Sequence, residues 1–338
     1  MHILIVDDDD VSLEALRHVL TEAGHEVTSA HDGAEALGWL RQERLRLVIT
    51  DWEMPSMDGL ELCRRIRAEE TDGYVYVVLL TSHTSGDHVV EGLSAGADDF
   101  IKKPFDPAEL RVRVRAGERI LALETRDLAI FAMAKLAESR DPETGAHLER
   151  VRSYARLLAE RLSQDHRRFG EIDAAYIRLV YLTSPLHDIG KVGLPDHVLL
   201  KPGRLDDREF AIMKTHTTIG AEVLEAELHR FPEAAFLRMA HDIALTHHER
   251  FDGGGYPRGL RGEEIALCGR IVALADVYDA LTSKRVYKQA IAHDVATGMI
   301  RVESGGHFDP RVVEAFLAAE EAFVEVWDRF RDLELSVA

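Results

Sequence analysis

The stretch Leu186-His187-Asp188-Ile189-Gly190-Lys191 places a nitrogen ligand, a carboxylate that can bridge two cations and a positive charge side by side. A lone His-Asp pair means little, because the chain contains two more, His241-Asp242 and His293-Asp294. Most such pairs are solvated.

Other candidate ligands strengthen the interpretation of His187-Asp188 as a metal-binding pair. They lie in segments with a helical pattern and are Glu143, His147, His216, His247, His248 and Asp276. Helix bundles build metal sites from inward-facing imidazoles and carboxylates of several helices. We therefore expect a metal centre around His187 and Asp188.

Composition sets limits on the rest of the chain. A length of 338 residues suits two domains with separate cores. The absence of a long apolar run and of a signal pattern predicts a cytoplasmic protein without membrane insertion. A formal net charge of -19 without a basic patch argues against DNA binding. The two cysteines, Cys63 and Cys268, cannot form a disulfide framework, and we expect both to be buried.

The first third of the chain alternates between short apolar runs and amphipathic stretches. The first apolar run ends in aspartates and is followed by a helical pattern from about Ser12 to Ala23. The expected strands are His2–Val6, Val27–Ala30, Leu45–Thr50, Tyr74–Thr81 and Phe100–Lys103. This alternation predicts an α/β fold with a doubly wound, parallel, five-stranded sheet, in which ligands bind at the carboxyl ends of the strands.

Polar side chains follow four of these strands. Asp7 and Asp8 follow the first strand and Asp51 the third, while Thr81 ends the fourth and Lys103 the fifth. Three carboxylates at one sheet edge suit a hard cation such as magnesium. A hydroxyl and an ammonium beside them suit a carboxylate that accepts a phosphoryl group.

Over roughly residues 1–120 the sequence resembles the receiver domain of bacterial response regulators, which has a flavodoxin-like fold. The matching motifs are Val6-Asp7-Asp8, Asp51-Trp52-Glu53-Met54-Pro55, Met57-Asp58-Gly59, Leu80-Thr81-Ser82 and Lys102-Lys103-Pro104-Phe105. The resemblance implies that a cognate histidine kinase phosphorylates Asp51.

The resemblance to the receiver domain also assigns roles to the remaining receiver residues. Asp7, Asp8 and Asp51 would hold magnesium, Thr81 and Lys103 would bind the phosphoryl oxygens, and Phe100 would be the aromatic switch. We expect the Lys103-Pro104 peptide bond to be cis.

Residues 106–140 are predicted to form one long connecting helix. Val114, Leu121 and Leu128 recur every seven residues, as one core position of a coiled coil does. The other core position, which includes Gly117, is not consistently apolar. Two alternatives follow: a parallel coiled-coil homodimer, or a helix that packs on its own domain. The expected domains are a receiver over 1–120, this helix over 106–140 and a catalytic domain over 125–338.

The chain from Asp141 onward is predicted to be mostly helical. A helix that begins at Asp141-Pro142 would stack Glu143 and His147 on one side, within reach of one ion. His187 and Asp188 are expected in the last turn of a helix that ends at Gly190.

Further ligands follow on later helices. A helix from Asp206 to about Glu227 would contribute His216. His247 and His248 would end the next helix, where adjacent side chains point about 100° apart and could touch two ions. A glycine-rich loop comes next, and then a helix with Asp276.

Leu186–Lys191, His247–Arg250 and Gly255-Tyr256-Pro257 resemble the HD-GYP subgroup of the HD phosphohydrolases. The resemblance covers roughly residues 125–325 and implies an all-α, HD-type metallohydrolase domain that opens cyclic di-GMP to linear pGpG or on to GMP. Implied metal ligands are Glu143, His147, His187, Asp188, His216, His247, His248 and Asp276. Implied substrate-binding residues are Lys191, Gly255, Tyr256, Pro257, Arg285 and Lys288.

A ligand set of imidazoles and carboxylates without thiolates predicts iron or manganese. Asp188 and Lys191 would be the catalytic residues, and Glu143 with His147 would hold a third ion. Two other functions stay open: an adaptor that binds cyclic di-GMP or a partner protein without catalysis, and an HD phosphohydrolase for another nucleotide.

Overall fold

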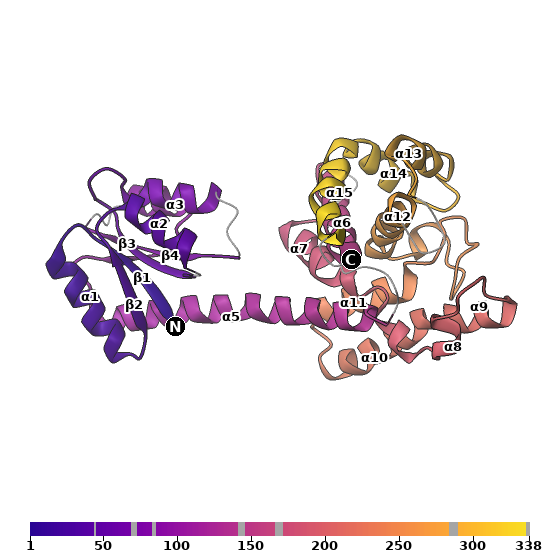
Figure 1. The fold of residues 1–338 in the computed structure, drawn as a ribbon, viewed down its shortest axis with the longest axis horizontal. Coiled ribbons are helices and arrows are strands. Elements are labelled where there is room, and N and C mark those ends of the chain that lie inside the picture. Colours follow the sequence, from indigo (N-terminus) through magenta and orange to yellow (C-terminus); the bar gives the residue numbers. More distant parts are fainter. Residues whose placement is uncertain are drawn as a thin grey trace. The chain divides into compact units, whose positions relative to one another are not determined.

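The computed structural model describes residues 1–43, 45–68, 73–82, 86–140, 146–165, 172–283 and 290–335. The chain forms two compact units, Met1–Leu128 and Ala129–Ala338 (Figure 1). Each unit has hydrophobic clusters of its own. Two separate cores are what the length of the chain predicts.

The first unit contains a parallel five-stranded sheet in the order β2-β1-β3-β4-β5. Its strands are β1 (His2–Val6), β2 (Glu26–Ala30), β3 (Leu47–Asp51), β4 (Tyr76–Thr81) and β5 (Asp99–Lys102). The predicted doubly wound sheet is therefore confirmed. The Lys103-Pro104 peptide bond is cis, as expected.

Helices cover both faces of this sheet (Figure 1). They are α1 (Asp10–Glu22), α2 (Gly33–Gln42), α3 (Gly59–Ala68), α4 (Gly86–Ser94) and α5 (Pro107–Glu138). Side chains alternate along β1, so Ile3 and Ile5 pack with α1 and the first half of α5. Leu4 and Val6 pack with α2 and α3 on the other face. The sheet is buried on both sides, which holds its strand ends in place.

The first half of α5 packs inside the first unit. Val114 and Leu121 are buried against the sheet, whereas Leu128 is exposed. A Cβ on Gly117 would lie 2.6 Å from the ring of Tyr76, so glycine is needed for this close approach. The intramolecular alternative is thus confirmed for this half of the helix.

In the described residues of the second unit, the regular structure is helical apart from an isolated bridge between Ser304 and Phe308. Its α-helices are α6 (Ala146–Ser163), α7 (Ala174–Thr183), α8 (Asp196–Leu199), α9 (Asp207–Lys214), α10 (His216–Arg230), α11 (Ala235–Thr246), α12 (Leu267–Thr282), α13 (His293–Val302), α14 (Pro310–Leu317) and α15 (Glu320–Leu335). Short 3-10 helices are η1 (Ser184–Leu186), η2 (Ile189–Gly193) and η3 (Gly262–Glu264). Within the described ranges, no helix has both the length and the apolar character that a membrane span needs.

Two local predictions in this unit are wrong. The expected helix over 206–227 is divided into α9 and α10, with the break at Thr215. The Thr215 hydroxyl donates to the carbonyl of Ile212 (2.7 Å), a local bond that competes with a continuous helix. His187 and Asp188 do not end an α-helix, because α7 stops before Pro185, which has no N–H to donate. The pair instead joins η1 to η2.

Both cysteines are free and buried, as predicted. Burial raises the pKa of the Cys63 and Cys268 thiols to about 12, so both stay protonated near neutral pH. We expect Ellman's reagent at about pH 8 to label neither thiol in the folded protein, because the thiolate is the nucleophile. In denaturant both should react. Rapid labelling of the native protein would contradict this burial.

Candidate functional site

Asp188 lies in the middle of a histidine cluster in the second unit. Its Oδ1 lies 3.1 Å from Nε2 of His216 and 3.6 Å from Nε2 of His247. Its Oδ2 lies 3.3 Å from Nε2 of His187. The two oxygens of one carboxylate therefore face different histidines, which is the arrangement that a bridging ligand needs.

The candidate ligand atoms form two groups in this unit, each with its atoms within 4.8 Å of one another. The first group is Asp188, His216, His247 and His248, and the second is His147, His187 and Asp276. All the predicted ligands within the described part of the chain thus come together. Glu143, with the helix start at Asp141-Pro142, lies outside the described residues.

The orientation of three histidine rings is set by their own backbone. Each Nδ1 lies within hydrogen-bond distance of a carbonyl oxygen: His187 with Ser184 (2.9 Å), His216 with Met213 (2.7 Å) and His247 with Ile243 (3.0 Å). A carbonyl only accepts, so Nδ1 must carry the hydrogen. Each Nε2 then presents its lone pair towards Asp188, as a metal ligand does.

Burial and neighbouring charges favour the metal-binding protonation states of His247, His248 and Asp188, whereas the Asp188 carboxylate favours protonated His187. Burial lowers the pKa of His247 and holds that of His248 well below its usual range. Burial acts to raise the pKa of Asp188, but Lys191, at 2.8 Å, and His187 hold it well below the ordinary value. For His187, burial opposes the charged form, yet the Asp188 carboxylate raises the net pKa. Neutral imidazoles and an ionised carboxylate are the forms that coordinate metals.

Two buried atoms at the centre of the site indicate that a cation belongs there. Nε2 of His187 and Oδ1 of Asp188 have no hydrogen-bond partner in the described part of the chain. Leaving one such buried group unsatisfied costs about 1–3 kcal/mol. A divalent ion in each ligand group would satisfy these atoms, so the residues present fit a metal centre.

Residues outside the two ligand groups contact the ring of His147. Its Nδ1 lies 2.7 Å from Oδ2 of Asp279, which also accepts a hydrogen bond from the buried Arg150 guanidinium (3.1 Å). The sequence-based prediction gave neither Asp279 nor Arg150 a role. Their spacing could have revealed them, because each follows a candidate ligand, Asp276 or His147, by three residues and so lies on the same helix face.

The glycine-rich loop borders the first ligand group. The ring of Tyr256 lies 4.8 Å from the ring of His248. A Cβ on Gly255 would lie 2.3 Å from the backbone nitrogen of Arg250, so only glycine allows this approach. Pro257 follows Tyr256 through a cis bond. The loop thus places an aromatic face beside the histidines.

Glu249 had no assigned role, yet its carboxylate holds this loop. It is buried and accepts hydrogen bonds from the backbone N–H groups of Arg258 (2.7 Å) and Leu260 (3.0 Å). The predicted phosphate contacts Arg285 and Lys288 lie outside the described residues.

The receiver site gathers its charges at the carboxyl ends of three strands. Nζ of Lys103 lies 2.7 Å from Oδ2 of Asp7 and 2.8 Å from Oδ1 of Asp51. Ligand atoms of Asp7, Asp8 and Asp51 lie within 4.8 Å of one another. Burial raises the pKa of Asp51, and Lys103 opposes that rise. Asp51 is therefore a buried carboxylate held beside a cation.

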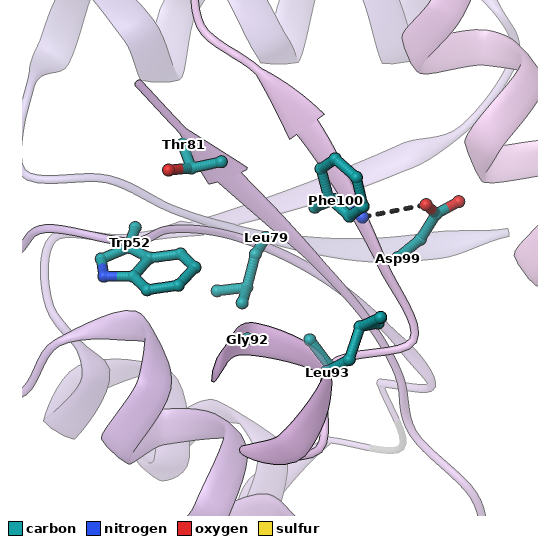
Figure 2. Close-up of a pocket in the computed structure, with 8 residues that line it drawn as sticks. Trp52, Leu79, Thr81, Gly92, Leu93, Asp99 and Phe100 are labelled. Atoms are coloured by element: carbon teal, nitrogen blue, oxygen red, sulfur yellow. Dashed lines mark hydrogen bonds between the residues drawn. The ribbon is translucent and has the colours of Figure 1, made fainter. Parts of the chain in front are cut away.

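Figure 2 shows Thr81 and Phe100 beside a small pocket next to this site. The pocket is lined further by Trp52, Leu79, Gly92 and Leu93. A Cβ on Gly92 would approach both Leu79 and Trp52 to 3.1 Å, so glycine keeps the pocket open. Thr81 thus ends β4, as the sequence predicts, and Phe100 lies near the start of the neighbouring strand β5.

Comparison with known proteins agrees with both halves of the molecule. Residues 3–115 match the family model of the response regulator receiver domain. Residues 132–312, more than half of the chain, match the family model of the HD domain.

Relatives match over nearly the whole chain. A protein of Xanthomonas campestris, named as the cyclic di-GMP phosphodiesterase response regulator RpfG, is 38% identical over 98% of this chain and 90% of its own length. A cyclic di-GMP phosphodiesterase of Thermotoga maritima is 36% identical over 99% of this chain and 95% of its own. A cyclic di-GMP phosphodiesterase of Vibrio cholerae is 55% identical over 62% of this chain and 42% of its own.

Fold and site together define a response regulator with a helical output domain of the metal-dependent hydrolase type. The chain belongs to the HD-domain family, in the branch that carries a receiver domain ahead of the HD domain.

Packing at Gly190 generates a first prediction for this site. A Cβ there would lie 1.9 Å from the carbonyl oxygen of His216 and 2.5 Å from the nitrogen of Gly220. We expect Gly190→Ala to destabilise the metal-free protein by about 1–3 kcal/mol or more in urea unfolding, as overpacking does. Gly203→Ala is the matched control, because nothing lies within 4 Å of that position. Equal stability of the two variants would disprove the tight contact.

Proposed function

We propose that this chain is a response regulator whose HD domain hydrolyses cyclic di-GMP to linear pGpG under the control of Asp51 phosphorylation. The observation that carries the proposal is Asp188, whose two oxygens face different histidines. Relatives that match nearly the full length are named cyclic di-GMP phosphodiesterases, which supports this substrate.

The two ligand groups would each hold a divalent ion, with Asp188 between them. Iron or manganese suits the imidazole and carboxylate donors, and no cysteine lies in either group. When bound, two such ions lower the pKa of a water molecule and stabilise the oxygens of an in-line displacement. A third ion beside Glu143 would take His147 as its ligand, and the second group would then hold its ion with His187 and Asp276.

The reaction adds the oxygen of water to phosphorus and breaks the bond between phosphorus and the 3′ oxygen, which opens the ring. Lys191 would stabilise charge on the phosphoryl oxygens, and its distance of 2.8 Å from Asp188 supports this role. Tyr256 offers an aromatic face for a guanine base, because bases stack on aromatic side chains. Gly255 and Pro257 would shape this contact, and Arg285 and Lys288 would bind the remaining phosphates.

In the receiver, Asp51 would accept the phosphoryl group from a histidine kinase, with magnesium held by Asp7, Asp8 and Asp51. Thr81 and Lys103 would bind the phosphoryl oxygens, and Phe100 would respond to the change. We further propose that the protein acts in the cytoplasm, with domains over 1–120 and 125–338 joined by the helix of 106–140. Formation of a homodimer is one way in which phosphorylation would control hydrolysis.

The hydrolase proposal predicts that Asp188→Asn abolishes cyclic di-GMP hydrolysis, because one substitution removes the charge shared by both ligand groups. Protein is purified without oxygen, its metals are counted, and products are resolved by chromatography. The helical circular dichroism should persist. Asp294→Asn is the control, since it changes the exposed aspartate of another His-Asp pair. Wild-type turnover by Asp188→Asn would reject the assignment.

The control proposal predicts that a phosphoryl mimic such as beryllofluoride changes hydrolysis or dimerisation, and that Asp51→Asn removes this response. A ligand shifts an equilibrium only as far as it distinguishes the two states, so both properties are measured with and without the mimic. The exposed Asp10 provides the control variant Asp10→Asn. If the mimic changes neither property of the wild-type protein, the receiver does not regulate it.

A further inference from the structure

The last turn of α5 carries a buried carboxylate. Phe131, Ala134 and Glu138 are spaced three and four residues apart and so lie on one face of the helix. Phe131 and Ala134 pack with Leu148 and Leu186, which immediately precedes His187. Glu138 continues this buried face and is 5% exposed. Glutamate is almost never fully buried unless it is paired.

The carboxylate of Glu138 faces His147, a member of the second ligand group. Its Oε1 lies 3.6 Å from Nε2 of His147, and Oδ1 of Asp276 lies 3.7 Å from the same nitrogen. The other nitrogen of His147 lies 2.7 Å from the Asp279 carboxylate. Among the described residues, three carboxylates therefore surround one imidazole in the interior of the second unit.

The tautomer of His147 decides what this arrangement requires. A carboxylate accepts, so Nδ1 donates its hydrogen to Asp279. In a neutral ring Nε2 then presents a lone pair to the oxygens of Glu138 and Asp276, which repel it. Either a proton or a metal ion between them removes the repulsion. Because His187 belongs to the same group, a metal ion would also satisfy its buried Nε2.

We propose that Glu138 is a further ligand of the ion that His147, His187 and Asp276 would hold. The inference rests on the proposed metal centre. Glu138 would complete a set of two imidazoles and two carboxylates, a donor set that suits iron or manganese. The ligand belongs to α5, the helix that also contributes Val114 and Leu121 to the core of the first unit.

The test is metal binding by Glu138→Gln, which keeps the shape of the side chain and removes its charge. Metal-free wild type and variant are titrated with Mn²⁺ without oxygen, and bound metal is counted by mass spectrometry and calorimetry. We expect one ion per chain to be lost or to bind about 10–100-fold more weakly, while the remaining binding is unchanged. Glu314→Gln, an exposed change in the same unit, should behave as wild type.

A second variant separates a ligand from a structural ion pair. Glu138→His offers another metal ligand, so it should restore the metal count that Glu138→Gln loses. If Glu138 only balances a protonated His147, the histidine would restore nothing, and the proposal fails. This comparison decides the question even if Glu138→Gln lowers stability in urea.

The outcomes also separate this inference from the proposed function. Wild-type Mn²⁺ binding by Glu138→Gln would overturn the role of Glu138 and leave the metal centre intact. No Mn²⁺ binding by the wild-type protein itself would overturn both.

Discussion

The burial of the Asp188 carboxylate among imidazoles is the constraint on which the second unit depends. Removing an ion from water costs several kcal/mol even after the protein relaxes. The Lys191 ammonium at 2.8 Å offsets part of this cost. The metal ions that we propose would offset the rest, and η1, η2, α10 and α11 converge where these ions would bind. Gly190 allows the closest of these approaches.

The first unit also brings carboxylates close together, but in a different fold. Asp7 and Asp51 end neighbouring parallel strands, and their charges are held together by Lys103 at 2.7 and 2.8 Å. In both units a lysine stabilises carboxylates that would otherwise repel or remain unpaired. The difference lies in the scaffold, because a sheet edge aligns its ligands by strand register, whereas the second unit gathers them from helix ends and short 3-10 turns.

Much of the site could be predicted from short motifs. The ligands in the part of the chain that the structure describes come together because each lies in or beside a helical segment with a fixed local register. Supporting residues were missed for a physical reason. Arg150 and Asp279 meet across helices although they are 129 residues apart in sequence, and Glu138 meets His147 of the next helix. The residue types alone indicate solvated helix faces.

The sequence by itself determined the fold of the first unit, the helical class of the second and the chemistry of the ligands, because strand alternation, helical spacing and side-chain type are local properties. Only the tertiary structure decided that α9 and α10 are separate helices and that His187 and Asp188 join two 3-10 turns. It also decided that Glu138 faces His147. The first two features come from local causes at Thr215 and Pro185 that the helical pattern did not reveal. The contact of Glu138 with His147 depends on how α5 packs against α6, and packing is a tertiary property.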